Sequence, residues 1–252
     1  MQKIVSDDIH HIVLVSGGLS SFEVSRRVYA TYERSKVHLW FFDTLNEDED
    51  VYRLLSDCII KLDMPLEIFH DGRTIWEVFR DERFIGNARV PICSRVLKRE
   101  LLEKILISRF PQKNVILYFG YDWFETKRID KNRIGWQKKG YMTCYPLADN
   151  KQSHNQLIKN VTSCGIKVPK LYLQGFKHNN CGGGCVRAGI QQWIHLLLTY
   201  PERYRWHEQE ELKTREYLNK DVSILKDRRD GQVKPMTLFA LRKRIERRGY
   251  DV

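Results

Sequence analysis

The segment 16–21, with the sequence SGGLSS, has the composition of an anion-binding loop. It follows residues 11–15, an apolar run typical of a short buried strand, and precedes residues 22–32, whose apolar side chains recur on one helical face. Backbone N–H groups and hydroxyls at the start of a helix can close around a phosphate. A strand, a glycine loop and a helix in this order indicate nucleotide binding at the end of a parallel sheet. A tight turn without a ligand is the alternative interpretation.

A second segment with chemical potential is 178–185, with the sequence HNNCGGGC. The spacing of Cys181 and Cys185 lies within the range of zinc ligands, and His178 or Cys93 could complete such a site. Alternatively, one of the two thiols could carry a persulfide or attack as a thiolate at a helix start, where the pKa of a thiol falls. The third interpretation is a glycine-rich turn whose thiols have no role. In every case the glycines would let the backbone approach a ligand closely.

Short apolar runs alternate with helical patterns through the first part of the chain, and these elements must position the two segments. The predicted strands are residues 11–15, 37–42, 66–69 and 115–119, and the predicted helices are residues 22–32, 46–61, 74–84, 94–109 and 152–163. This alternation favours an α/β fold with a doubly wound parallel sheet. The polar, basic stretch 121–145 indicates a functional loop or lid.

The composition of the chain shifts near residue 175. Beyond it, helical patterns at residues 188–200, 201–217 and 237–248 predict a helical C-terminal extension. We therefore expect a nucleotide-binding α/β domain over residues 1–175 and a Cys-containing helical region over residues 176–252.

The chain has 252 residues, a formal net charge of +11 and six scattered cysteines, too few for a disulfide scaffold. A basic surface attracts polyanions, so nucleic acid is a natural partner, unless the charges are solvated helix faces. The basic C-terminus could instead contact a second subunit in a homodimer. No apolar run approaches the roughly 18 residues of a membrane helix, and the first residues lack the features of a signal peptide. We therefore expect a cytoplasmic protein without membrane contact.

Residues 16–21 resemble the PP-loop of the ATP pyrophosphatase superfamily (adenine nucleotide alpha hydrolase-like proteins), whose pattern is Ser-Gly-Gly-x-Asp-Ser. Later segments resemble its phosphoadenosine phosphosulfate reductase-like branch, and these are Asp43-Thr44-Leu45-Asn46-Glu47, Cys93-Ser94-Arg95 with Lys98, Gly120 through Glu125 with Arg128, Tyr145-Pro146-Leu147, and the pair Cys181 and Cys185. The likeness covers residues 13–189. It departs at two points: Ser20 stands where aspartate is usual, and three residues instead of two separate the paired cysteines.

The resemblance implies a Rossmann-like fold that binds ATP with Mg²⁺ and cleaves ATP between the α- and β-phosphates. The leading hypothesis is adenylation of a substrate, for sulfur transfer or for modification of a nucleotide or nucleic acid. Cysteines placed like Cys181 and Cys185 can hold an iron–sulfur cluster in this branch. One alternative is a non-catalytic module that binds or senses an adenine nucleotide, which Ser20 favours. The others are a phosphoadenosine phosphosulfate-type reductase and a nucleic-acid-binding scaffold.

The resemblance also assigns residues to roles. The implied nucleotide-binding residues are Ser16, Gly17, Gly18, Leu19, Ser20, Ser21, Asp43, Thr44, Gly120, Glu125 and Arg128, and the catalytic candidates are Ser20, Asp43, Arg128, Cys181 and Cys185. Asp43 would orient Mg²⁺ or the ribose, or else cap the following helix. Arg128, with Lys127 or Arg95, would neutralise charge at the α-phosphate, or else form a surface salt bridge.

Overall fold

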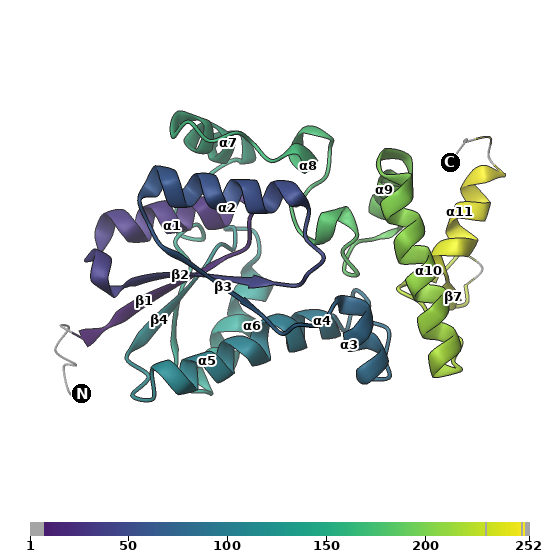
Figure 1. Ribbon diagram of the computed structural model, residues 1–252, viewed down its shortest axis with the longest axis horizontal. Helices are drawn as coiled ribbons and strands as arrows, with labels where there is room; N and C mark the ends of the chain where they lie inside the picture. Colours follow the sequence, from purple (N-terminus) through teal and green to yellow (C-terminus); the bar gives the residue numbers. More distant parts are fainter. Residues whose placement is uncertain (1–7, 230, 248, 250–252) are drawn as a thin grey trace. The chain divides into compact units, whose positions relative to one another are not determined.

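A five-stranded sheet organises the first part of the chain (Figure 1). The computed structural model describes residues 8–229, 231–247 and 249. Its strand order is β3-β2-β1-β4-β5, and the strands are β1 (His10–Val15), β2 (Val37–Asp43), β3 (Leu66–His70), β4 (Val115–Phe119) and β5 (Met142–Cys144). β1 pairs in parallel with β2 and β4, and β4 pairs in parallel with β5. The prediction of a doubly wound α/β fold is confirmed.

Helices cover both faces of this sheet, which explains why the central strands read as continuous apolar runs. α1 (Leu19–Thr31) and α2 (Glu49–Leu62) lie on one face, and α5 (Leu101–Arg109) and α6 (Thr126–Gln137) lie on the other (Figure 1). A further helix, α7 (His154–Ser163), packs on α1. In the central register Val13 of β1 lies opposite Leu39 of β2 and Tyr118 of β4, and all three side chains are buried.

The prediction that residues 121–145 form an irregular loop is wrong for most of that stretch. It contains α6 and β5. α6 buries only Ile129 and Trp136, and most of its other residues are polar or basic, so its sequence carries almost no apolar period. β5 has three residues, which is too short for a strand pattern to show.

The chain forms two compact units, and it passes between them several times. The first unit contains the residues up to Phe42, Glu49–Phe69 and Leu102–Lys170. The second contains Asp43–Asp48, His70–Leu101 and the chain from Leu171 onward. The second unit thus includes the C-terminal region expected over residues 176–252, together with two segments that precede residue 175.

The second unit is mainly helical. Its helical elements are α3 (Ile75–Asp81), α4 (Ile92–Ser94), the π-helical turn η3 (Arg95–Glu100), the 3₁₀ turn η4 (Cys181–Gly183), α9 (Ile190–Thr199), α10 (Pro201–Leu218) and α11 (Leu238–Glu246). It also contains the antiparallel pair β6 (Leu225–Asp227) and β7 (Lys234–Met236). Two further short helices of the chain are η2 (Arg34–Lys36) and α8 (Lys170–Leu173). Trp76, Trp193 and Tyr204 are fully buried in its core. The strands β6 and β7 were not predicted. No helix in the described ranges combines the length and apolarity needed to cross a bilayer.

Glu211 of α10 is a buried carboxylate that fastens the second unit together. Its Oε1 accepts the N–H of Ile224 (2.9 Å) and its Oε2 accepts the N–H of Leu238 (2.6 Å), so one side chain fixes the chain before β6 and the start of α11. Burial raises the pKa of Glu211 to about 7, although the two amides act in the opposite direction. Between pH 4.5 and about pH 7, the folded protein therefore keeps a proton on Glu211 that the unfolded chain has released.

We expect Glu211→Gln to change stability in a pH-dependent way. Between the unfolded pKa of 4.5 and the folded pKa of about 7, the wild type loses about 3 kcal/mol of unfolding free energy through this group. Glutamine cannot accept both amides, which costs about 1–3 kcal/mol, but it does not titrate. Urea unfolding should therefore show a penalty for Glu211→Gln that shrinks by about 3 kcal/mol from pH 4.5 to pH 7.5.

The neighbouring Glu210 provides a control of opposite sign. Burial by itself would raise the pKa of Glu210, but ion pairs with Lys213 and Arg80 outweigh it and lower that pKa. Its stabilising contribution is therefore present above its unfolded pKa and disappears as the pH falls. The penalty for Glu210→Gln should grow toward high pH. Equal penalties for Glu211→Gln at both pH values would contradict the role assigned to Glu211.

Candidate functional site

The loop after β1 can be built only with glycine at position 17. Gly17 has a φ of 71°, in the left-handed region. A Cβ there would lie 2.5 Å from Cγ1 of Val51 in α2. The loop therefore runs tightly against α2 before it enters α1.

The first turn of α1 has no side-chain cap. Its N-cap residue is Gly18, which has no side chain to accept the N–H groups that follow. The amides of Leu19, Ser20 and Ser21 have no acceptor within the helix. Ser16 is exposed, and Gly18 and Ser20 are half-buried, so this end of the helix is open to solvent. Uncapped amides and the helix dipole make it a site where an anion is stabilised.

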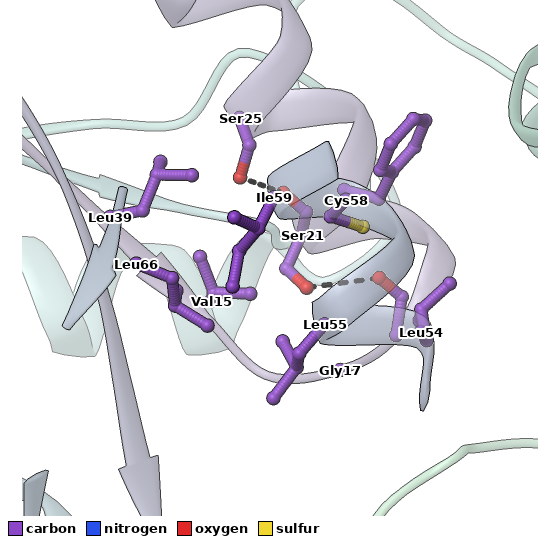
Figure 2. Close-up of a pocket in the computed structure, with 12 residues that line it drawn as sticks. Val15, Gly17, Ser21, Ser25, Leu39, Leu54, Leu55, Cys58, Ile59 and Leu66 are labelled. Atoms are coloured by element: carbon purple, nitrogen blue, oxygen red, sulfur yellow. Dashed lines mark hydrogen bonds between the residues drawn. The ribbon is translucent and has the colours of Figure 1, made fainter. Parts of the chain in front are cut away.

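The hydroxyl of Ser21 serves the loop itself. It donates to the carbonyl of Gly18 (2.9 Å) and accepts the N–H of Ser16 (3.1 Å). In Figure 2 the Ser25 hydroxyl points to the backbone of Ser21, where it donates to the carbonyl (2.8 Å). The hydroxyl of Ser21 is thus engaged within the loop. Leu19 and Ser21 are both almost fully buried, so neither side chain is open to a ligand.

The small cavity in Figure 2 lies behind the loop, between α1 and α2. Its volume is about 10 Å³, and apolar side chains such as Leu54, Leu55 and Ile59 contribute to its lining. A single water needs about that much room together with polar partners. The cavity is therefore a packing gap and not a nucleotide pocket.

Gly120, immediately after β4, packs against the uncapped turn. A Cβ on Gly120 would lie 2.9 Å from the amide nitrogen of Ser21 and 3.1 Å from the carbonyl carbon of Ser20. β1 and β4 are neighbours in the sheet, and the chain leaves β1 toward β2 on its other side. Such a topological switch point is where open α/β sheets bind ligands. The structure therefore brings together the predicted residues 16–21 and Gly120.

The loop after Gly120 carries a carboxylate that the sequence analysis missed. The Asp122 carboxylate lies near the Ser20 hydroxyl, which acts to lower its pKa, and the N–H of Asp122 donates to Oε2 of Glu125 (3.0 Å). Burial, and then the carboxylate of Glu125, raises the pKa of Asp122. Asp122 lies inside the motif that pointed to Gly120, Glu125 and Arg128, but only the tertiary contact with Ser20 singles it out.

Glu125 and Arg128 shape this loop together. Arg128 Nη1 lies 2.5 Å from Glu125 Oε1, and its guanidinium carbon lies 3.9 Å from the centre of the Tyr121 ring. The salt bridge that was the alternative interpretation of Arg128 is present. The side chain is nevertheless half-exposed, so the guanidinium remains accessible to a ligand at this loop.

The other predicted nucleotide residues belong to the second unit. Asp43 does not cap α2, which begins at Glu49; its Oδ1 accepts the N–H of Leu45 (2.8 Å) in a local turn. The hydroxyl of Thr44 donates to Oε1 of Glu47 (3.0 Å). Arg95 forms ion pairs with Glu82 and Glu100.

A second polar centre lies within the second unit, around η4. The N–H of Cys181 donates to Oε2 of Glu47 (2.5 Å), and Lys98 Nζ lies 3.5 Å from Oε1 of the same carboxylate. The Glu47 side chain is fully buried. Neither Lys98 nor Glu47 was assigned a role here from the sequence, because both lie far from Cys181 along the chain.

The three glycines between the thiols fit against protein and not against a ligand. A Cβ would lie 3.2 Å from Nη1 of Arg203 at Gly182, 2.6 Å from the Phe176 ring at Gly183, and 2.4 Å from Nε2 of His207 at Gly184; Gly183 also has a φ of 86°. The expectation that these glycines make room for a ligand is therefore replaced by an internal packing role.

The two thiols of this turn have different protonation. A hydrogen bond from Cys181 lowers the pKa of Cys185 to about 6, with further help from the N–H of Arg187 and the ammonium of Lys98. The pKa of Cys181 is raised, because Cys181 donates that hydrogen bond and because desolvation and the Glu47 carboxylate oppose its ionisation. At neutral pH Cys185 is therefore a thiolate and Cys181 a thiol. A helix start is not the cause, since α9 begins five residues later, at Ile190.

The proposed metal ligands do not form a metal site in the part of the chain that the structure describes. No three His, Cys, Asp or Glu side chains there lie close enough to share an ion. His178 is exposed, and burial raises the pKa of Cys93 to about 11, so Cys93 is a neutral thiol. The positive charge near Cys185 is the ammonium of Lys98.

Comparisons with known proteins find a likeness in structure but none in sequence. No model of a known protein family matches the chain, and no curated protein sequence matches it. Among solved structures, the phosphoadenylyl-sulfate (PAPS) reductase from Candida auris, in a phosphate complex, is similar with a TM-score of 0.47 and 15% sequence identity. The similarity covers 69% of this chain and 82% of that chain.

Proposed function

We propose that this protein binds ATP at the first turn of α1 and cleaves it between the α- and β-phosphates to adenylate a substrate. The observation that carries the proposal is the uncapped start of α1, which lies at the switch point of the sheet against Gly120. The resemblance of residues 16–21 to a PP-loop gives the anion its identity as the pyrophosphate end of a nucleotide.

The chain's own groups supply what this reaction needs. The amides of Leu19, Ser20 and Ser21 would hold the leaving pyrophosphate, and the helix N-terminus adds roughly half a positive charge. The Arg128 guanidinium would neutralise charge that develops at the α-phosphate. Tyr121 and Glu125 already orient that guanidinium.

The donor set beside the loop fits Mg²⁺, which prefers hard oxygen ligands. The Asp122 carboxylate and the Ser20 hydroxyl lie near each other and would hold the ion. Bound Mg²⁺ would supply charge neutralisation on the phosphates. The PP-loop pattern has an aspartate where this chain has Ser20, so Asp122 would restore the carboxylate from the neighbouring loop.

Pyrophosphate release from ATP tests the proposal, with water accepting the adenylyl group when no other acceptor is present. Removal of Arg128 should slow release about a hundredfold while ATP affinity changes much less, because the charge it neutralises develops in the transition state. Arg133→Ala is the matched control, since Arg133 lies on the same helix and forms a similar salt bridge with Asp130. Equal effects of Arg128→Ala and Arg133→Ala would contradict the role of Arg128.

The same assay separates the alternative suggested by Ser20. Tight ATP binding without pyrophosphate release would identify a nucleotide-sensing module. Failure to bind ATP would refute both functions.

A further inference from the structure

We propose that Cys181 and Cys185 form a thiol–disulfide exchange pair in which Cys185 attacks the sulfur–sulfur bond of a substrate. The site lies wholly within the second unit and goes beyond the proposed nucleotide chemistry. Its substrate class is a molecule with an S–S bond, either a disulfide or a persulfide.

The backbone between the two thiols is held in place by several side chains. Glu47 accepts the N–H of Cys181 (2.5 Å), Arg203 donates to the carbonyl of Gly182 (2.7 Å), and Gln192 donates to the carbonyl of Gly183 (2.8 Å). Arg203 is itself fixed by Asp48 (2.8 Å). The turn is therefore preorganised, with Cys181 and Cys185 at its two ends.

Both cysteines are free and half-buried, so neither is enclosed in the core. Cys58 and Cys93, by contrast, are buried. This partial exposure distinguishes Cys181 and Cys185 from a buried structural cysteine.

Lys98 provides the charge that an attacking sulfur needs. It lies on the π-helical turn η3, a type of helical irregularity that is frequent at functional sites. Its ammonium is close to Cys185 and to Glu47, and its side chain remains 30% exposed. Burial alone would lower the pKa of Lys98, but Glu47 and the two sulfurs raise it, so the ammonium stays charged.

The reaction balances as two displacements. The Cys185 thiolate attacks R–S–S–R′, which forms a mixed disulfide with RS and releases R′S⁻. Cys181 then loses its proton to solvent and attacks the Cys185 sulfur, which forms the Cys181–Cys185 disulfide and releases RS⁻. The substrate gains two electrons, and the protein pair loses two. An external dithiol, such as dithiothreitol, restores the pair.

The test uses the full-length protein without nucleotide, so that failure of the ATP hypothesis does not affect it. Reduced wild-type protein is treated with glutathione disulfide, and peptide mapping by mass spectrometry should find the Cys181–Cys185 disulfide. In Cys181→Ser the reaction should stop at a glutathione adduct on Cys185. In Cys185→Ser the rate at which the protein reacts with glutathione disulfide should fall at least tenfold. Cys164 is a partly exposed cysteine of the first unit, and Cys164→Ser should react as the wild type does.

A parallel reaction with glutathione persulfide distinguishes the two substrate sources. If sulfide release from the persulfide is faster than glutathione release from the disulfide, the preferred substrate is a persulfide. If it is slower, the preferred substrate is a disulfide. Two results would overturn the proposal: a first adduct on Cys181, or no intramolecular disulfide in the wild type. Stoichiometric zinc or iron that Cys185→Ser releases would also overturn it.

Discussion

Gly120→Ala will weaken ATP binding at least tenfold, while Gly135→Ala will leave binding unchanged. A Cβ at position 120 meets backbone atoms of Ser20 and Ser21 at 2.9–3.1 Å. Backbone cannot yield as a flexible side chain can, so the loop must move away from α1. That displacement separates Asp122 and Arg128 from the uncapped amides. A tenfold loss corresponds to about 1.4 kcal/mol, within the range of about 1–3 kcal/mol that overpacking costs.

Both variants add one methyl group to a glycine, so they differ only in what surrounds that methyl group. Gly135 lies within α6, and a Cβ there has nothing within 4 Å. Alanine should stabilise that helix by up to about 1 kcal/mol. Calorimetric titration with ATP measures affinity, and urea unfolding shows whether each variant is folded. If folded Gly120→Ala bound ATP as tightly as the wild type, the nucleotide would have to lie elsewhere.

Alkylation of Cys185 by iodoacetamide will accelerate only about twofold between pH 6 and pH 8. With a pKa of about 6, Cys185 is half deprotonated at pH 6 and almost fully deprotonated at pH 8. An ordinary thiol with a pKa of about 8.5 would accelerate about 70-fold over the same range. The ratio of the two rates removes the effect of accessibility, which slows alkylation equally at both pH values. Reactivity should fall below pH 6, as the thiolate is protonated.

Lys98→Gln tests the cause of this flat profile. Loss of the ammonium should raise the pKa of Cys185 and make the rate ratio between pH 8 and pH 6 several times larger. Lys104→Gln, an exposed lysine on α5, should retain the wild-type ratio. Mass spectrometry of the Cys185 peptide at timed intervals supplies both rates. A wild-type ratio near 70 would show that Cys185 is an ordinary thiol.

The fold could be predicted from the sequence wherever burial leaves a periodic pattern. β4 was predicted with its observed bounds, Val115–Phe119, because each residue lies in a covered sheet. The start of α1 was placed three residues late, since Leu19 and the serines before Phe22 carry no apolar period. α6 was missed because its basic surface outweighs its two buried residues.

The candidate site was predictable where neighbouring residues carry it and not where folding assembles it. Residues 16–21 are contiguous, so their composition suffices. Asp122 gains meaning only through its contact with Ser20, and Lys98 only through Glu47 and Cys185. The metal hypothesis for Cys181 and Cys185 came from their spacing and from the family resemblance. Neither source shows the Lys98 ammonium, which only folding brings close to Cys185.

The repeated passage of the chain between its two units limits how this protein can have diversified. Trp76, Phe79 and Leu97 precede the C-terminal helices in sequence, yet they belong to the same apolar core as those helices. Recombination that exchanged everything after Leu171 would leave these three side chains without their neighbours. The C-terminal segment from Leu171 onward therefore does not carry a complete apolar core by itself.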